Sequence, residues 1–257
     1  MEGIPVVDFA LFMEDPGIAR KRLESLEKIN KACKEFGLFQ LVNHGLDSHI
    51  LSKALQNAHS FFELPLEYKC KFTTANNSVG FVHQSGAKGG PLDRKEHFMI
   101  AAEDKSTLWP DLISSFSLGA PGETLRKCYD KNADYYNFLH YPACSDYQGQ
   151  VLAPHQDGTI FTMVSQLNRV PGYQVWTNGL YKGAVHRVVA NKAQRFSFVY
   201  SYLPEGKTRI APIPEFASGH PKYKSFMQED YLKLRFENKR LENNFSKNIT
   251  IDYYAID

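Results

Sequence analysis

The sequence predicts a β-rich α+β fold, in which an all-β core is covered by helices. Apolar residues recur at helical spacing in the first third of the chain, whereas short alternating segments follow from about Tyr135 onward. Helices that precede a block of strands, instead of alternating with strands, favour such a layered arrangement. With 257 residues, of which 43% are apolar, the chain is long enough for one domain with a substantial core.

We expect a single domain over residues 1–257, made of three consecutive regions. Residues 1–130 would form a mixed, mostly helical region, and residues 131–206 the β core that carries the functional site. Residues 207–257 would contribute a C-terminal helix and a last strand.

The N-terminal region shows clear helix signals. Asp15 and Pro16 place a capping residue and a helix-opening proline before an apolar stripe, and Gly37 provides a helix end. A second helix begins after Asp47 and stops before Pro65. Short strands are predicted on either side of the first helix, at Pro5–Phe9 and Leu38–Val42.

The later elements are mainly strands. Alternation of side chains predicts strands at Tyr136–Tyr141, Thr159–Gln166, Gly183–Ala190 and Gln194–Leu203. After them we expect a helix over Lys222–Phe236 and a strand at Ile249–Tyr254.

Composition excludes several classes of function. Thirty basic and 28 acidic side chains give a net charge of +2 without long runs of one sign, which excludes a footprint for nucleic acid or an anionic membrane. The apolar runs are far shorter than the roughly 20 residues that span a bilayer. Four cysteines without a C-x-x-C pair indicate a reducing compartment, so we expect a cytoplasmic protein.

The segment around His155 and Asp157 could bind a metal. In an extended segment, side chains two residues apart point to the same face, so this imidazole and this carboxylate would converge. His186, in a later strand-like run, could complete a set of two imidazoles and one carboxylate, which is typical of non-haem Fe(II) oxygenases. Taken alone, H-x-D is a weak signal, and a turn histidine followed by a loop-capping aspartate explains it better than a metal site does.

Arg195 and Ser197 share one face of the predicted strand Gln194–Leu203. An arginine inside a β core is costly unless it meets an anion, and its planar fork suits a carboxylate, to which the Ser197 hydroxyl could add a hydrogen bond. The alternative is an edge-strand arginine that faces water.

Taken in order, these segments resemble the Fe(II)/2-oxoglutarate-dependent dioxygenases of the isopenicillin N synthase-like class. The resemblance runs from Ile4 to about Leu241 and includes H-x-D at 155–157 and R-x-S at 195–197. The other matching segments are IPVVDF (4–9), FGLFQLVNHG (36–45), FFELPLEYK (61–69), DRKEHF (93–98), HYP (140–142) and HRVV (186–189).

The resemblance implies a double-stranded β-helix, or jelly roll, with flanking helices. It implies that His155, Asp157 and His186 bind Fe(II). It further implies that Arg195 and Ser197 hold the distal carboxylate of 2-oxoglutarate, helped by Tyr141. O2 and a small organic substrate would complete the reaction, and we expect a monomer. In the family's N-x-Y motif, this chain has Leu139 in place of the asparagine.

The chain is shorter than the resemblance requires. Only 28 residues separate Asp157 from His186, whereas about four intervening strands with their turns need roughly 30–40 residues. The pattern of a helix also stops short near Asp130–Lys131. Either residues are missing from the sequence as given, which predicts α-carbon breaks there and between Val170 and Trp176, or the chain is a genuinely shortened variant. We favour the first explanation.

Three other functions stay open at this point. The chain could be an Fe(II) oxidase that does not use 2-oxoglutarate, with Arg195 and Ser197 binding the carboxylate of the substrate itself. It could also be a non-catalytic relative that binds a small molecule or a metal. A structural β-sandwich with accidental motifs would require His155, Asp157 and His186 to lie far apart.

Overall fold

The computed structural model describes most of the chain. The described residues are 3–13, 19–73, 80–83, 95–101, 133–144, 150–159, 161–164, 174, 177–189, 192–240 and 249–256. Within these ranges, no helix is both long enough and apolar enough to cross a membrane. The places where we predicted breaks, near Asp130–Lys131 and between Val170 and Trp176, lie outside these ranges apart from Gln174, so that prediction stays untested.

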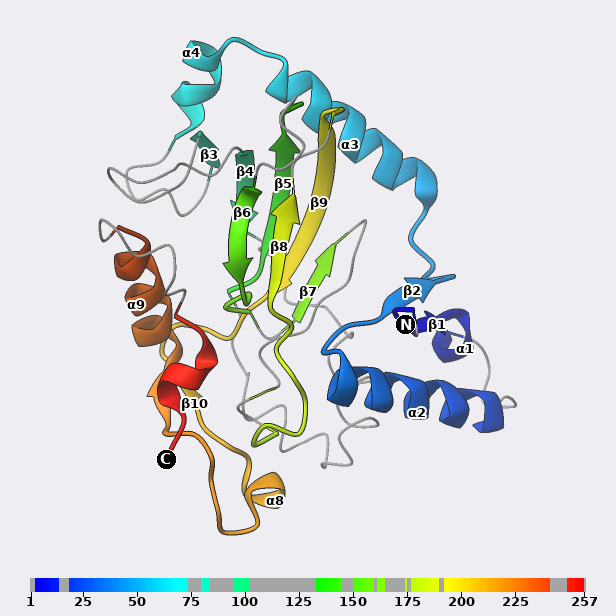
Figure 1. Cartoon of the computed structure of the whole chain (residues 1–257). Helices are drawn as coiled ribbons and strands as arrows, with labels where there is room; N and C mark the ends of the chain where they lie inside the picture. Colours follow the sequence, from blue (N-terminus) through cyan, green and yellow to red (C-terminus); the bar gives the residue numbers. More distant parts are fainter. Residues whose placement is uncertain are drawn as a thin grey trace.

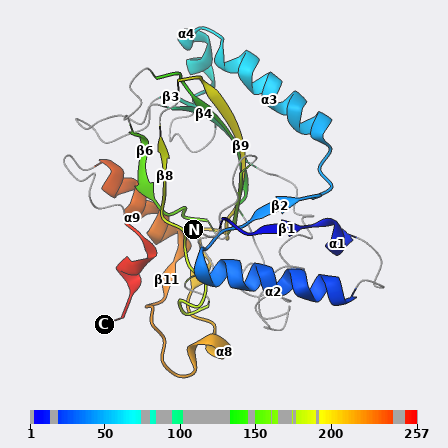
Figure 2. The same ribbon diagram turned by 45° about the vertical axis from the view of Figure 1, so that its right-hand side comes forward.

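Two antiparallel sheets face each other and form the core (Figures 1 and 2). The larger sheet has five strands and the smaller has two, so the predicted β-rich core with flanking helices is present. In spatial order the larger sheet contains β3 (Gly80–His83), β4 (Glu96–Ala101), β5 (Tyr135–Tyr141), β9 (Arg195–Tyr202) and β7 (Phe161–Val164); the smaller pairs β6 (Gln150–His155) with β8 (His186–Val189).

Side chains that point between the two sheets form a small apolar cluster. Leu139 and Tyr141 of β5 and Val199 of β9 contact Val151 of β6, and Val188 of β8 packs against them. Because side chains alternate along a strand, the odd-numbered residues of β5 and β9 line this inner face.

The outer face of the larger sheet is covered by α3 (Ser48–Phe62), as Figure 2 shows from the side. Phe62 and Ala58 of α3 are buried against the same cluster as Phe138 of β5 and Phe196 of β9. The helix begins where we predicted, because the Asp47 carboxylate accepts a hydrogen bond from the backbone N–H of His49. The short helices α4 (Leu66–Lys69) and η2 (Cys70–Phe72) follow it.

The N-terminal segments lie beside this core. Strand β1 (Val6–Asp8) pairs in parallel with β2 (Gln40–Val42), and between them come α1 (Ala10–Met13) and α2 (Ala19–Glu35). Gly37 ends the helical segment with φ +71°, and a Cβ there would collide with the backbone carbonyl of Lys182.

Two expectations about the C-terminal region are wrong in detail. The predicted helix over Lys222–Phe236 begins only at Gln228, because the preceding residues form a strand that pairs with another. The elements of this region are β10 (Arg209–Ile210), α8 (Pro214–Ala217), β11 (Phe226–Met227), α9 (Gln228–Arg240) and η3 (Ile251–Tyr254).

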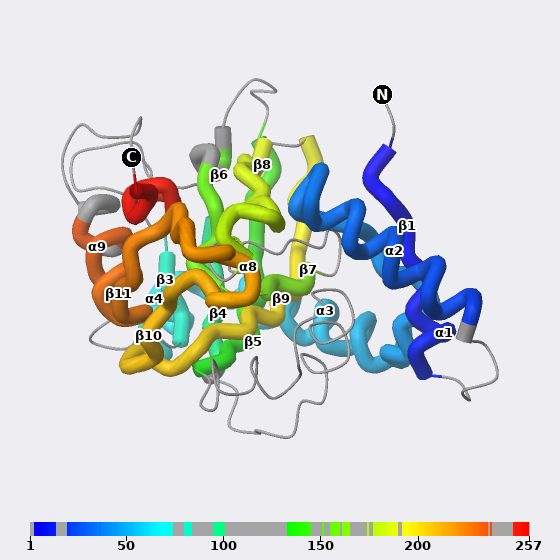
Figure 3. Tube along the Cα trace, turned by 90° about the horizontal axis from the view of Figure 1, so that it is seen from below, coloured from blue at the N-terminus to red at the C-terminus, as the bar shows by residue number. Residues whose placement is uncertain are grey.

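The predicted last strand, Ile249–Tyr254, is instead the 3-10 helix η3. Residues three apart align in such a helix, so Ile251 and Tyr254 can both pack against the core. Tyr254 stacks on Phe226, with 4.0 Å between the ring centroids. Figure 3, seen from below, places this C-terminal region on the opposite side of the sheets from α2.

The β core is not confined to residues 131–206, as we had expected. Strands β3 and β4 come from the region 1–130, and they extend the larger sheet beyond β5. The N-terminal region therefore supplies part of the core sheet as well as the covering helices.

Candidate metal centre

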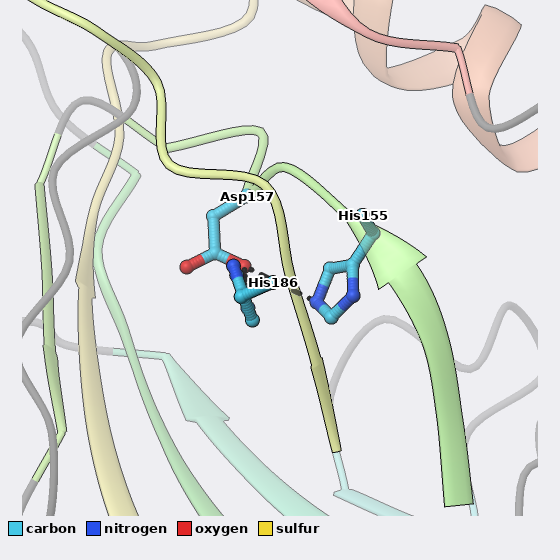
Figure 4. Close-up of side chains that lie close together, drawn as sticks. All are labelled: His155, Asp157 and His186. Carbon is cyan, nitrogen blue, oxygen red and sulfur yellow. Dashed lines mark ion pairs between the residues drawn. The ribbon is translucent and has the colours of Figure 1, made fainter. Parts of the chain in front are cut away.

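His155, Asp157 and His186 meet at one end of the smaller sheet. His155 is the last residue of β6 and His186 the first of β8, and the two are cross-strand partners. The Asp157 Oδ1 atom lies 3.5 Å from the Nε2 atom of each histidine. Figure 4 shows the three side chains converging on a common point.

The donor set suits one metal ion. One ligand atom from each of the three residues lies within 4.8 Å of the others, and within the described ranges this is the one histidine, cysteine or carboxylate group that fits an ion. The side chains are only 12–20% exposed. Two imidazole nitrogens and one carboxylate oxygen are the ligands that non-haem Fe(II) sites use. The geometry thus agrees with the predicted ligand set, while the ligand role itself stays a prediction.

The Asp157 carboxylate is held in its charged form. Burial raises its pKa, but hydrogen bonds from His155 and Thr162, together with the positive charges of His155 and Arg235, outweigh burial and bring the pKa below its ordinary value. The Thr162 hydroxyl is itself 2.6 Å from that of Thr159. An ionised carboxylate is the form that binds a metal.

Arg195, Ser197 and Tyr141 lie together on the inner face of the larger sheet. Tyr141 is the cross-strand partner of Arg195, and Leu139 is the partner of Ser197. The Arg195 guanidinium lies 4.6 Å from the centroid of the Tyr141 ring and donates to the backbone carbonyl of Val189 at 3.0 Å. Arg195 is thus partly buried and directed toward Val189, at the end of β8 opposite to His186, and its role in binding 2-oxoglutarate stays a prediction.

The same inner face continues toward the metal ligands with polar residues. Burial raises the pKa of Tyr135, and the negative charge of Asp157 adds to this effect, although a hydrogen bond with Ser201 opposes it. Between Tyr135 and Leu139 lies Asn137, whose buried amide oxygen has no hydrogen-bond partner among the described residues. Tyr135 and Asn137 precede Leu139 and Tyr141 at every second position of β5, so side-chain alternation in the sequence already places all four residues on one face.

A second polar cluster is buried on the other side of the larger sheet. The Lys69 ammonium lies 2.9 and 3.0 Å from the two carboxylate oxygens of Glu96, and His83 and His140 contact these oxygens at 3.0 and 3.1 Å. Burial raises the pKa of Glu96, but the hydrogen bonds from His140, Lys69 and His83 and the Lys69 charge lower it to about 2. Lys69 lies in the segment FFELPLEYK (61–69) and Glu96 in the segment DRKEHF (93–98). Their ion pair therefore connects two of the segments on which the family resemblance rests.

Comparisons with known proteins agree with this architecture. Residues 4–113 match the family model described as "non-haem dioxygenase in morphine synthesis N-terminal". S-norcoclaurine synthase 1 of Coptis japonica is 26% identical, over 93% of this chain and 83% of the relative. The 2-oxoglutarate-dependent dioxygenase 19 of Oryza sativa subsp. japonica is also 26% identical, over 92% of this chain and 87% of the relative.

Solved structures share the fold. JOX2, in complex with 2OG, Fe and JA, superposes with a TM-score of 0.78 at 20% identity, over 99% of this chain and 89% of JOX2. The dioxygenase for auxin oxidation of rice gives a TM-score of 0.69 at 16% identity, over 99% of this chain and 100% of the rice protein. The core is therefore the double-stranded β-helix of the 2-oxoglutarate oxygenases.

The alignments also bear on the length of the chain. The alignment with S-norcoclaurine synthase 1 extends over 299 residues, which exceeds the 257 residues of this chain, so the relative has residues without a counterpart here. Relatives that match nearly the whole chain, a family model over its N-terminal part and the shared fold all point in the same direction. The chain is similar to Fe(II)/2-oxoglutarate-dependent dioxygenases over nearly its whole length and shares their fold.

Proposed function

We propose that this protein catalyses the O2-dependent oxidation of a small organic molecule, with Fe(II) as its metal and 2-oxoglutarate as its cosubstrate. The observation that carries the proposal is the convergence of His155, Asp157 and His186 at the end of β6 and β8, in a chain that is similar to 2-oxoglutarate-dependent dioxygenases. When bound, the iron would supply the redox chemistry that couples the conversion of 2-oxoglutarate and O2 into succinate and CO2 to oxidation of the substrate.

The protein residues would bind and orient the reactants. Arg195 would hold the distal carboxylate of 2-oxoglutarate, with Ser197 and Tyr141 beside it on the inner face. To do so, Arg195 must exchange its present hydrogen bond to the Val189 carbonyl for the carboxylate. The apolar cluster of Leu139, Val151 and Val199 would keep water away from the reacting groups.

The names of the relatives refer to different kinds of oxidation. Relatives of similar identity are named as feruloyl CoA ortho-hydroxylase 1 of Arabidopsis thaliana and as a flavonoid 7-O-demethylase of Ocimum basilicum. Hydroxylation, desaturation, demethylation and cyclisation can all follow removal of one hydrogen atom. We therefore propose the class of reaction without choosing among these outcomes.

One observation favours a second candidate, an Fe(II) oxidase that does not use 2-oxoglutarate. Leu139, which replaces an asparagine of the family motif, is only 8% exposed and is paired with Ser197. An apolar side chain at this position removes one polar partner for the cosubstrate, so Arg195 and Ser197 could hold the carboxylate of the substrate itself. A non-catalytic relative is the further alternative, and its motivation is the shortened chain.

A titration without oxygen tests the proposal. Fe(II) is added to the protein under nitrogen, 2-oxoglutarate follows, and the visible spectrum is recorded for the weak charge-transfer band of the chelate. The band is expected for the wild type and is absent for Asp157→Ala. Stoichiometric succinate on admission of O2 separates the 2-oxoglutarate enzyme from the second candidate, and metal binding without any turnover supports the non-catalytic alternative.

The oligomeric state, the binding partners and the cellular compartment are also part of the proposal. We infer a monomer with a small-molecule substrate, without nucleic-acid or membrane partners, in the cytoplasm. The near balance of 30 basic and 28 acidic residues supports the absence of an electrostatic partner surface. Light scattering coupled to gel filtration, on the protein with and without Fe(II), tests the oligomeric state.

A further inference from the structure

We propose that helix α9 holds the metal-binding loop in place, and that Arg235 is a positioning residue for Asp157. The inference rests on the proposed metal site and adds a dependence that the ligand motif does not contain. It predicts that the affinity of the site for a divalent cation depends on side chains of the C-terminal helix, which lies far beyond the loop in sequence. Figure 1 shows α9 and η3 beside the end of β6.

The backbone on both sides of Asp157 is bound by side chains of α9. Arg235 donates from Nη2 to the carbonyl oxygen of Gln156, which belongs to the peptide that enters Asp157. Gln228 donates from Nε2 to the carbonyl oxygen of Gly158 at 3.0 Å. Arg235 therefore holds the peptide that enters Asp157, and Gln228 holds the peptide between Gly158 and Thr159, one peptide beyond the one that leaves Asp157.

The loop and the helix are in close contact. A Cβ added to Gly158 would lie 3.0 Å from Nη1 of Arg235 and 3.3 Å from Cδ2 of Leu232, so both side chains would have to shift by a few tenths of an ångström. The loop and the side chains of α9 are therefore closely packed.

Arg235 is itself held in position from within the core. Its Nη1 donates to the hydroxyl of Tyr231 at 3.2 Å, and its guanidinium lies 5.3 Å from the centroid of the Tyr231 ring. Tyr231 is 4% exposed and its ring contacts Phe226 and Tyr254, with centroids 5.5 and 5.9 Å away. The arginine is therefore oriented before any metal binds.

Gln156 extends the same support to the other metal-binding strand. Its Nε2 donates to the carbonyl oxygen of Gly183 at 2.9 Å, three residues before His186, and its Oε1 accepts from the backbone N–H of Ile251 at 3.2 Å. The C-terminal residues thus link the loop of His155 and Asp157 to the approach of His186.

A positioning role and a purely electrostatic role of Arg235 predict opposite changes in metal affinity when the side chain is replaced. Residues that orient metal ligands typically contribute about 10-fold to 100-fold to metal affinity, so loss of the Arg235 hydrogen bond should weaken binding. However, the Arg235 charge acts on Asp157 and would repel a cation, so its removal alone should tighten binding. The sign of the change therefore separates a positioning role from a purely electrostatic one.

The experiment measures Co(II) binding by calorimetry and by the visible Co(II) spectrum, together with the melting temperature of the metal-free protein. The variants are Arg235→Met, which removes charge and hydrogen bonds, Arg235→Lys, which keeps the charge, and Gln228→Leu, which removes the second hydrogen bond. Lys233→Met is the matched control, since Lys233 is an exposed cation on the same helix.

Positioning by α9 predicts that Arg235→Met and Gln228→Leu each raise the Co(II) dissociation constant about 10-fold or more, that Arg235→Lys restores binding only in part, and that Lys233→Met leaves it unchanged. Unchanged or tighter binding in folded Arg235→Met and Gln228→Leu would overturn the inference. If Arg235→Met does not fold, Gln228→Leu and Arg235→Lys decide by the same criterion. Wild-type protein that binds Co(II) no better than His155→Ala would instead overturn the proposed metal site.

Discussion

His155 and His186 are direct cross-strand partners in the antiparallel pair of β6 and β8, and their ring centroids lie 4.1 Å apart. The metal-binding geometry is thus a consequence of strand register. A slip of one residue would turn one imidazole to the opposite face of the sheet. The register of this two-stranded pair therefore decides whether the proposed metal ligands can meet.

The first prediction concerns the metal ligands. His155→Ala or Asp157→Ala removes a ligand from a cluster at the end of a strand, so we expect turnover to be lost while the fold is largely kept. Succinate formation measures turnover, and circular dichroism checks the fold. Retained activity in either folded variant would remove the iron hypothesis.

The second prediction concerns the cosubstrate. Loss of a partner from a desolvated carboxylate costs on the order of 2–5 kcal/mol, so Arg195→Ala should raise the 2-oxoglutarate concentration needed for half-maximal activity by at least tens-fold. Arg195→Lys keeps the charge without the planar fork and should show an intermediate effect. An unchanged requirement for 2-oxoglutarate, measured in steady-state assays of both variants, would assign Arg195 another role.

The third prediction uses the buried cluster around Glu96, whose pKa is lowered from 4.5 to about 2. A carboxylate with a lowered pKa in the folded state stabilises the fold above its unfolded pKa, and the contribution is lost as the pH falls from about 4.5 to about 2. Glu96→Gln leaves Lys69 buried without a counter-charge and should reduce the free energy of unfolding on the order of 3 kcal/mol near neutral pH.

Urea unfolding at a series of pH values measures this effect. The difference between wild type and Glu96→Gln should be largest above pH 4.5 and should shrink as the pH approaches 2. A difference that does not change with pH in this window would mean that the charge of Glu96 contributes nothing to stability.

The fourth prediction concerns Asn137. An amide oxygen that is buried without a partner costs about 1–3 kcal/mol, and within the described part of the chain the Asn137 oxygen is in this state. Asn137→Leu keeps the branching at Cγ but carries no polar atom, and it should raise the melting temperature. Because Asn137 lies on the inner face between Leu139 and Tyr135, the same variant should weaken substrate oxidation more than uncoupled succinate formation. A variant that melts lower would show that the oxygen is satisfied in solution.

Local patterns were enough to pair His155 with Asp157, because the two residues are close in sequence, whereas His186 comes from a later strand. His155 and Asp157 are two residues apart in an extended segment, and Arg195 and Ser197 repeat that spacing, so alternation alone placed each pair on one face. The start of the helix after Asp47 could be predicted equally well from the sequence, since one capping side chain marks it. These features depend on neighbours in sequence.

The features that we missed depend on contacts between distant segments. No local signal joins Lys69 to Glu96, or Arg235 to Gln156, because each pair meets only after the sheets and helices have assembled. The last predicted strand failed for a similar reason, since packing of Ile251 and Tyr254 against the core selects a 3-10 helix. The alignment with S-norcoclaurine synthase 1 is longer than this chain, but whether residues are missing from the sequence as given, or the chain is a genuinely shortened variant, stays untested.

The two faces of strand β9 pack against different parts of the domain. Its Phe196 packs outward with α3, whereas Val199 and Ser197 face the space between the sheets. Substitutions at Phe196 would therefore act on the packing of α3, whereas substitutions at Val199 would act on the packing between the two sheets. Alternate positions of this one strand thus join three layers of the domain: the covering helix, the larger sheet and the smaller sheet.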